Sequence, residues 1–146
     1  MAGSAEELVS LLVLEELDLD LFRGRQPATG RQRVFGGQVA AQSVMAANRS
    51  VDDVFVMHSL HSYFLRAGDP AVPIVYDVER IRDGRSFATR RVMARQHGRP
   101  IYYLTANFQQ PEDGFEQARL HELLAELRLL VPEEHAMREE LSLIHI

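Results

Sequence analysis

The chain has 146 residues, enough for one domain with a buried core, and its 46% hydrophobic and 25% charged residues are typical of a globular protein. The absence of cysteine excludes disulfides, thiolate metal sites and cysteine nucleophiles. The first 17 residues carry glutamates and no basic residue, which argues against a secretory signal, and no apolar stretch is long enough to cross a bilayer. We therefore expect a cytoplasmic protein without a membrane span.

The net charge of −5 is unevenly distributed along the chain. Residues 23–111 hold 13 of the 16 arginines and six carboxylates, which gives +7 between two acidic ends, and lysine is absent. Because a guanidinium pairs well with phosphate, this basic segment admits an anionic ligand. It has no interleaved stacking platform and no recognition helix, so we expect no nucleic-acid partner.

The first part of the chain predicts two helices with a loop between them. Residues 4–22 are acidic and rich in leucine, and Ser4 followed by glutamates is typical of a helix start. Residues 23–34 mix glycine and proline with polar residues and indicate a loop. Residues 39–48 are small or apolar almost all round, which indicates a helix buried on every side.

Four strands are predicted next, at 54–65, 72–81, 87–96 and 99–110. The dipeptides Asp83-Gly84 and His97-Gly98 indicate tight turns, which make neighbouring strands antiparallel. A sheet with one apolar face needs a helix to cover it, so the pattern predicts an α+β fold. The pattern alone leaves open which kind of one-helix sheet this is.

Several strings of the sequence carry more information than this pattern does. They include Arg33-Val-Phe-Gly-Gly-Gln-Val39, His58-Ser-Leu-His-Ser-Tyr-Phe-Leu-Arg-Ala-Gly-Asp-Pro70 and Arg82-Asp-Gly-Arg-Ser-Phe87. In order and spacing they resemble the type II acyl-CoA thioesterases, over about residues 14–116. The resemblance implies a single hotdog fold, in which an antiparallel sheet wraps around one central helix. It also implies hydrolysis of fatty acyl-CoA to a free fatty acid and coenzyme A, in fatty-acid metabolism.

Members of this family carry two hotdog repeats, and an Asp, a Ser or Thr, and a Gln of the second repeat activate a water. This chain resembles the first repeat only, so no catalytic residue is carried over. We expect an acidic segment at 1–13, the hotdog domain at 14–111, and a linker helix with a truncation tail at 112–146. Residues 141–146 resemble the translation of a transposon-end sequencing adaptor, so we expect a truncated gene model.

Six residues are candidates for substrate binding: Phe35, Gly36, Gly37, Gln38, His58 and Arg66. The first four open the second helix, whose first N–H groups suit an oxyanion or a phosphate, and glycine permits a close approach. The alternative is a tight turn, with glycine needed for a positive φ or for packing. Arg66 opens a turn in which Gly68 suits a positive φ, the Asp69 side chain suits capping and Pro70 fixes the next φ. Arg66 itself either contacts the substrate or pairs with Asp69.

His58 is a candidate general base, and the alternative is a hydrogen-bonded core histidine. On a regular strand it shares a face with Leu60 and Phe64, while His61 lies on the other face. The two histidines then form no metal pair, and we expect no metal and no cofactor. Seven arginines bracket the two hairpins and either suit the phosphates of coenzyme A or form a solvated face: Arg80, Arg82, Arg85, Arg90, Arg91, Arg95 and Arg99.

The resulting hypothesis is acyl-CoA hydrolysis by family, weakened or lost in this chain because the second repeat is missing. The expected partners are acyl-CoA and either a second hotdog repeat or another copy of the chain, because a lone sheet leaves an edge exposed. An alternative is a non-catalytic half that binds acyl-CoA or dimerises. A third is a self-sufficient single-hotdog enzyme, which needs an acid and a base of its own.

Overall fold

The computed structural model describes residues 5–27, 30, 32–112 and 114. The chain divides into two compact units, Met1–Pro111 and Glu112–Ile146, and the fold below is that of the first. The predicted helix at 115–130 and the tail that follows it lie outside the described residues. No described helix is long and apolar enough to cross a membrane.

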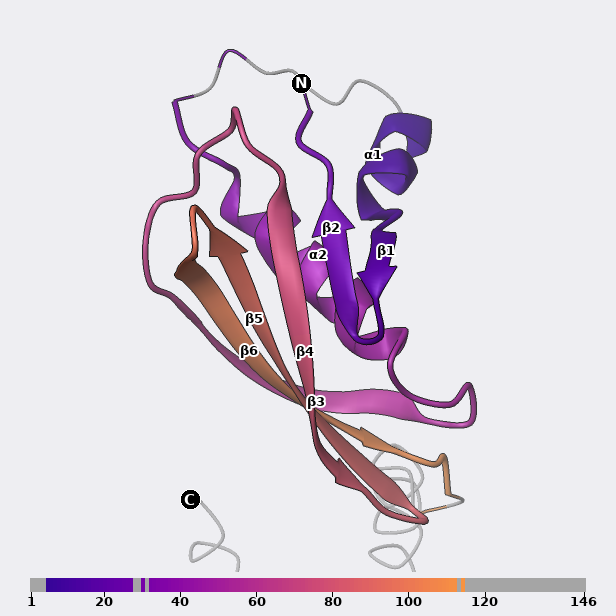
Figure 1. The fold of residues 1–146 in the computed structure, drawn as a ribbon. Coiled ribbons are helices and arrows are strands. Elements are labelled where there is room, and N and C mark those ends of the chain that lie inside the picture. Colours follow the sequence, from indigo (N-terminus) through magenta and orange to yellow (C-terminus); the bar gives the residue numbers. More distant parts are fainter. Residues whose placement is uncertain (1–4, 28–29, 31, 113, 115–146) are drawn as a thin grey trace, which may run out of the picture. The chain divides into compact units, whose positions relative to one another are not determined.

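The first unit contains two helices and one six-stranded sheet (Figure 1). The helices are α1 (Ala5–Leu12) and α2 (Gly36–Asn48). The strands are β1 (Glu15–Asp18), β2 (Leu21–Gly24), β3 (Val56–Phe64), β4 (Ile74–Asp83), β5 (Phe87–Gln96) and β6 (Arg99–Gln109). In the sheet they follow the order β1-β2-β4-β5-β6-β3, and every neighbouring pair is antiparallel. The four predicted strands and the α+β class are confirmed.

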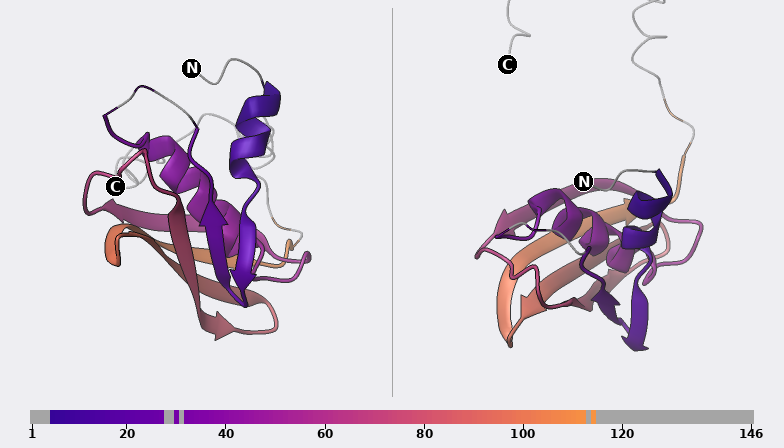
Figure 2. Two further views of the ribbon diagram at one scale, coloured as in Figure 1. Left: turned by 45° about the horizontal axis from the view of Figure 1, so that its top comes forward. Right: turned by 90° about the horizontal axis from the view of Figure 1, so that it is seen from above.

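The sheet curves around α2, which lies against its concave face (Figure 2). Strand alternation sends one set of side chains of β4, β5 and β6 towards the helix, among them Tyr76, Val92 and Leu104, each fully buried. α2 contributes Val39, Ala46 and Ala47 to the same core. The predicted arrangement of a sheet around one central helix is therefore present.

Burial of α2 differs from the prediction. Its buried residues are Val39, Gln42, Ser43, Ala46 and Ala47, which form one side of the helix. Other positions, such as Gly37 and Asn48, are exposed. The expectation of burial on every side was wrong, because small side chains allow close packing on any face and do not tell which faces are covered.

Two short strands were not predicted. β1 and β2 have four residues each, and the sequence interpretation placed them in an acidic segment and a loop. Long-range pairing holds them in the sheet, since Phe22 of β2 lies opposite Tyr76 of β4. A four-residue strand is too short to show an alternation of its own.

Candidate functional site

A hollow of about 310 Å³ opens at the start of α2. Four segments line it: the approach to α2, the helix itself, the end of β3 with the turn after it, and the start of β6. The lining residues are Arg33, Val34, Gly36, Val39, Phe64, Leu65, Arg66, Ala67, Gly68, Ile101 and Tyr102. The structure thus brings together two of the predicted substrate-binding residues, Gly36 and Arg66.

The two glycines at the start of α2 make room for aromatic rings. A Cβ atom on Gly36 would lie 3.0 Å from Cε1 of Phe64, and one on Gly37 would lie 2.5 Å from Cε1 of Phe35. Neither glycine has a positive φ, so the packing explanation holds and the conformational one does not. Phe35 caps the helix with an extended backbone and without a side-chain hydrogen bond. The helix therefore begins beside the hollow with its first N–H groups pointing away from the helix body.

Gln38 faces the segment that precedes the helix. Its Nε2 donates to the backbone oxygen of Arg25 at 3.1 Å and to Oε1 of Gln26 at 3.2 Å. Both hydrogens of this amide nitrogen are engaged, which leaves Oε1 of Gln38 as the atom that can meet a ligand.

The turn from Arg66 to Pro70 forms one wall of the hollow. Asp69 accepts a hydrogen bond from the N–H of Ala71 at 2.8 Å and lies 3.3 Å from Nε2 of His97. The Ala71 hydrogen bond, followed by His97, lowers the pKa of Asp69. Arg66 instead donates to the backbone oxygen of Pro100 at 2.8 Å. The side-chain capping expected of Asp69 is present, and the neighbour of its carboxyl is the His97 ring rather than Arg66.

Gly68 of the same turn was expected to need a positive φ. It does not have one, and a Cβ there would lie 3.0 Å from Cγ2 of Val34. The N–H of Val34 donates to the backbone oxygen of Gly68 at 3.0 Å. Glycine is therefore required because the backbone before α2 passes directly over this turn.

His58 lies away from the hollow. The pairing of β3 with β6 skips it, since Met57 is opposite Phe108 and Ser59 is opposite Asn107. This bulge shifts the alternation by one residue. Leu60 then faces the helix side, opposite buried Ala106, while the His58 ring meets the Phe87 ring at 6.4 Å.

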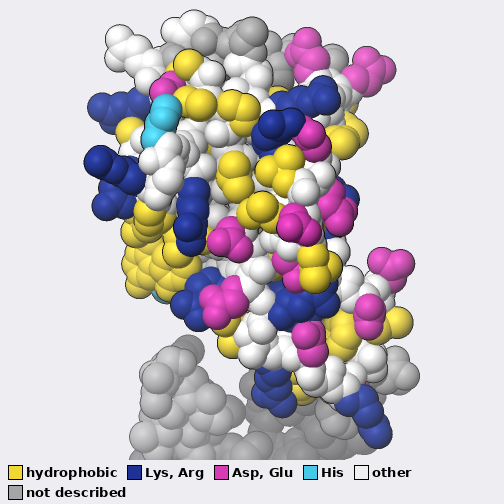
Figure 3. Space-filling model, viewed as in Figure 1, with side chains coloured by type: hydrophobic (Ala, Val, Ile, Leu, Met, Phe, Trp, Pro, Cys, Tyr) yellow, Lys and Arg dark blue, Asp and Glu magenta, His cyan; other side chains and the backbone are white. Residues whose placement is uncertain are grey.

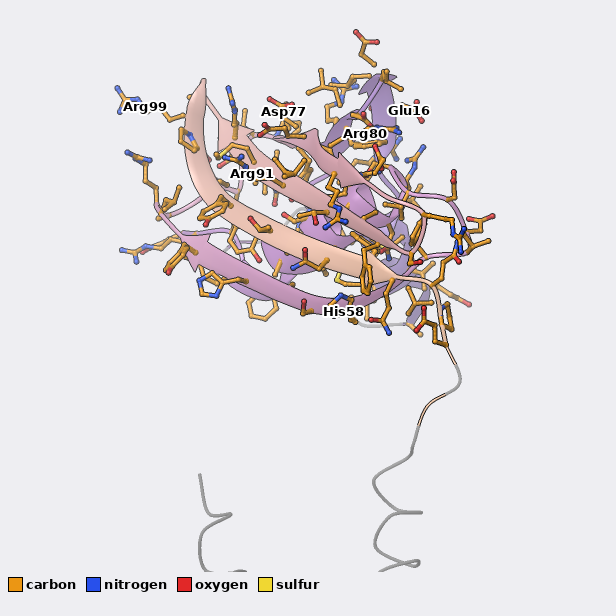
Figure 4. The ribbon with its side chains drawn as sticks, turned by 90° about the horizontal axis from the view of Figure 1, so that it is seen from below. Glu16, His58, Asp77, Arg80, Arg91 and Arg99 are labelled. Atoms are coloured by element: carbon orange, nitrogen blue, oxygen red, sulfur yellow. The ribbon has the colours of Figure 1, made fainter. Side chains whose placement is uncertain are left out.

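The predicted sharing of a face by His58, Leu60 and Phe64 was therefore wrong. Phe64 packs against Gly36 of α2 and lies six positions after His58 on the strand, about 20 Å along the chain. Figure 4 shows His58 on β3 and Arg99 at the other end of the sheet. The structure does not bring His58 together with Gly36 and Arg66.

The seven arginines of the hairpins do not form one surface. Arg90 is 1% exposed and its guanidinium donates to the backbone oxygens of Ser50 and Arg82 and to Asp83. Three others pair with carboxylates: Arg80 with Asp20, Arg91 with Glu79 and Arg95 with Asp77. Positive and negative side chains alternate on the face seen in Figure 3. The solvated-face interpretation fits the exposed members, and Arg90 is a buried structural residue.

Arg33 and Arg66 contrast with these paired arginines. Both line the hollow, and neither has a carboxylate partner among the residues that the structure describes. The sequence interpretation did not include Arg33 among the site residues, although Arg33 opens the Arg33–Val39 string. A positive, partly apolar hollow at a helix start is suited to a ligand with an anionic group and an apolar part.

The comparisons with known proteins agree with this arrangement. Residues 23–109 match the family model described as acyl-CoA thioesterase N-terminal domain. Human acyl-coenzyme A thioesterase 8 is 50% identical over 105 residues, which are 72% of this chain and 33% of that protein. Acyl-CoA thioesterase 2 of Haemophilus influenzae is 46% identical over 116 residues, 80% of this chain and 41% of that protein. The chain thus spans about a third to two fifths of the length of these relatives.

Solved structures show the same fold. The acyl-CoA thioesterase II TesB2 from Mycobacterium marinum superposes with a TM-score of 0.68 at 48% identity, over 74% of this chain and 41% of that one. A protein from Alicyclobacillus acidocaldarius, described as having a hot dog fold, gives a TM-score of 0.66 at 21% identity, again over 74% and 41%. The predicted hotdog fold is confirmed, and the chain belongs to the acyl-CoA thioesterase family, whose N-terminal domain it matches.

Proposed function

We propose that this chain forms the substrate-binding first half of an enzyme that hydrolyses fatty acyl-CoA thioesters to free fatty acid and coenzyme A. The family supports thioester hydrolysis. The observation that carries the proposal for this chain is the hollow beside the start of α2, on whose lining Arg33 and Arg66 have no carboxylate partner among the described residues. A cytoplasmic location remains a prediction.

Each part of the hollow suits a part of the substrate. The N–H groups of Gly36 and Gly37, at the start of α2, are placed to polarise a thioester oxygen. The rings of Phe35 and Phe64 lie against these glycines and offer an apolar surface to the acyl chain, and Arg33 and Arg66 pair with the phosphates of coenzyme A. Gln38 offers Oε1 as an acceptor for an N–H or O–H of the substrate. A substrate contact of His58 remains a prediction.

The resemblance assigns the water-activating residues to a second repeat, so we expect the purified chain to bind acyl-CoA and hydrolyse it slowly or not at all. Titration of decanoyl-CoA in a calorimeter measures binding, and release of free thiol measures hydrolysis. Arg66→Gln is expected to weaken binding, whereas Arg99→Gln, outside the hollow, is not. Equal binding by both variants would refute the placement of the site, and turnover at the rate of a two-repeat relative would refute the impaired activity.

We also propose that β3 pairs with a second hotdog unit, either the second repeat or another copy of this chain. β3 lies at the edge of the sheet, and Val56, Leu60, Tyr63 and Phe64 are 50–63% exposed. An edge strand with unpaired backbone groups and apolar side chains is a template for another strand. Light scattering on the purified chain tests pairing with another copy of the chain. A dimer is expected, and a monomer at all concentrations would contradict this pairing.

The alternative function is a non-catalytic half that binds acyl-CoA or dimerises. The hollow and the β3 edge favour it as well, since neither needs a catalytic residue. The hydrolysis assay separates the two, because the alternative requires binding without any turnover even when the chain is mixed with a second-repeat fragment of a relative.

A further inference from the structure

Two glutamines of α2 donate hydrogen bonds to one backbone carbonyl. The Nε2 atoms of Gln38 and Gln42 lie 3.1 and 3.3 Å from the backbone oxygen of Arg25. Residues four apart project from the same side of a helix, one turn above the other, so both amides reach the same point. Arg25 directly follows β2, where the chain leaves the sheet before it reaches the hollow at Arg33.

Gln42 is fully buried, and its whole amide group is engaged. Besides Arg25, its Nε2 donates to the backbone oxygen of Leu11 at 2.6 Å, and its Oε1 accepts from the hydroxyl of Tyr76 at 2.6 Å. Burial raises the pKa of Tyr76 far above its usual value, so the hydroxyl keeps its proton and remains a donor. A Cβ on Gly24 would lie 2.5 Å from Oε1 of Gln42, so the end of β2 passes against this amide.

One side chain therefore connects α1, β4 and Arg25, directly after β2, to the central helix. An apolar side chain of the same size would fill the space equally well, but it would leave the Leu11 carbonyl and the Tyr76 hydroxyl without this partner. It would also remove one of the two donors to the Arg25 carbonyl, which would keep only Gln38. The position calls for a group with two donors and an acceptor, which is what a primary amide offers.

The connection leads to the candidate site. Gln38 lies in the first turn of α2 and shares the Arg25 carbonyl with Gln42, and it also holds Gln26. At the far end of the same segment, the N–H of Val34 is bound to Gly68, in the wall of the hollow. The Arg25 carbonyl is thus bound by the first turns of α2, and Val34, just before that helix, is bound to the wall of the hollow.

We propose that Gln42 is a positioning residue, which sets the start of α2 relative to Arg25 and Gln26 through the Arg25 carbonyl, with Tyr76 holding the amide in place. The inference rests on the proposed function only where it states that this helix start binds a ligand. The positioning itself is a property of the free chain.

Amide hydrogen exchange of the free, full-length chain tests the positioning. Tyr76→Phe removes one hydroxyl, and Gln42→Leu removes the whole amide. Ser43→Ala is the matched control, since Ser43 is fully buried on the same helix and its hydroxyl donates only within it, to the backbone oxygen of Val39. We expect exchange about five- to tenfold faster at Val34 and Gln38, whose N–H groups donate to the backbone oxygens of Gly68 and Phe35, in both test variants, with β5 and β6 unchanged. The control is expected to leave Val34 and Gln38 as protected as in the wild type.

Acceleration spread evenly over β5 and β6, or an equal change in Ser43→Ala, would overturn the proposal, because both indicate general loss of stability. If Gln42→Leu does not fold, Tyr76→Phe decides the result alone. Titration with decanoyl-CoA then tests whether this positioning affects the candidate site. Tyr76→Phe is expected to bind decanoyl-CoA severalfold more weakly than the wild type, although its melting temperature is expected to be no lower than that of Ser43→Ala. A wild-type chain that binds no decanoyl-CoA would refute the proposed function and leave the exchange result as the test of Gln42.

Discussion

The two edges of the sheet are built in opposite ways. β1, at one edge, has four residues, all exposed and three of them acidic, and its pairing with β2 is interrupted between Glu16 and Asp18. Glu15 pairs with Arg23 across that edge at 2.6 Å. β3, at the other edge, has nine residues and exposes Val56, Leu60 and Phe64.

This difference indicates which edge of the sheet can pair with another chain. We call the β1 edge the closed edge and the β3 edge the open edge. Short length, charge and an interrupted register are the means by which a sheet edge avoids pairing with another chain. The β1 edge has all three. The β3 edge is longer and carries apolar side chains, and its single irregularity at His58 lies near its beginning. We therefore expect association through β3 and none through β1.

The largest effect is expected from a change that detaches the closed edge from the core. Phe22 of β2 is 2% exposed, and the Arg49 guanidinium lies 4.8 Å from the centre of its ring. Phe22→Ala removes the side chain that anchors β2 and should lower the free energy of unfolding by about 3–5 kcal/mol. Urea denaturation measures it. Leu19→Ala, 77% exposed beside the same strand, is the control and should stay within about 0.5 kcal/mol. A loss below about 1 kcal/mol for Phe22→Ala would mean that the edge charges hold the strand.

The next effect concerns association. Leu60→Glu places a charge on the helix side of β3, where Leu60 is half exposed. If this edge pairs with a second copy, burial of the leucine contributes about 1.5–3 kcal/mol, so the dissociation constant should rise at least about tenfold. Leu19→Glu adds the same charge at the closed edge and should leave it unchanged. Sedimentation velocity compares the two variants, and identical behaviour would remove the distinction between the edges.

A smaller effect is expected from the ion pair of the closed edge. Arg23 and Glu15 have side chains 44% exposed, so water and salt screen their attraction. Arg23→Gln should cost at most about 1 kcal/mol, and less at high salt. Urea denaturation at low and high salt measures both values. A cost of several kcal/mol that persists in salt would show that charge, rather than Phe22, fixes this edge.

The sequence predicted the parts of the fold that repeat locally. β6 alternates cleanly from Tyr102 to Gln109, and the dipeptides before β5 and β6 mark tight turns, so these hairpins were predictable. Arg90 was not identified as buried, although it lies on the same face of β5 as Ala88 and Val92. Its partners Ser50, Arg82 and Asp83 lie on other segments, and only the fold brings them together.

The candidate site was predictable only in part. Gly36 and Arg66 were identified from strings of the sequence, and the structure places both at the hollow. The bulge at His58 depends on how β3 pairs with β6, which no local pattern reveals. Arg33 lines the hollow because the chain before α2 meets the turn after β3, and this contact between distant segments is set by the fold and not by a local pattern.

The smallest effect is a pH dependence at the turn that follows the open edge. Asp69 has its pKa lowered from 3.8, first by the Ala71 N–H and then by His97. A carboxyl whose pKa is lower in the folded chain stabilises it above the ordinary aspartate range, and this contribution is lost as the pH falls through the folded pKa. The melting temperature of the wild type should therefore fall more steeply below about pH 4 than that of Asp69→Asn, which keeps an acceptor for the Ala71 N–H but no charge.

Asp53→Asn, at another exposed aspartate, should follow the wild type. Parallel curves for wild type and Asp69→Asn would show that the turn is held by Gln96, which bonds the backbone on both sides of it, without help from this charge.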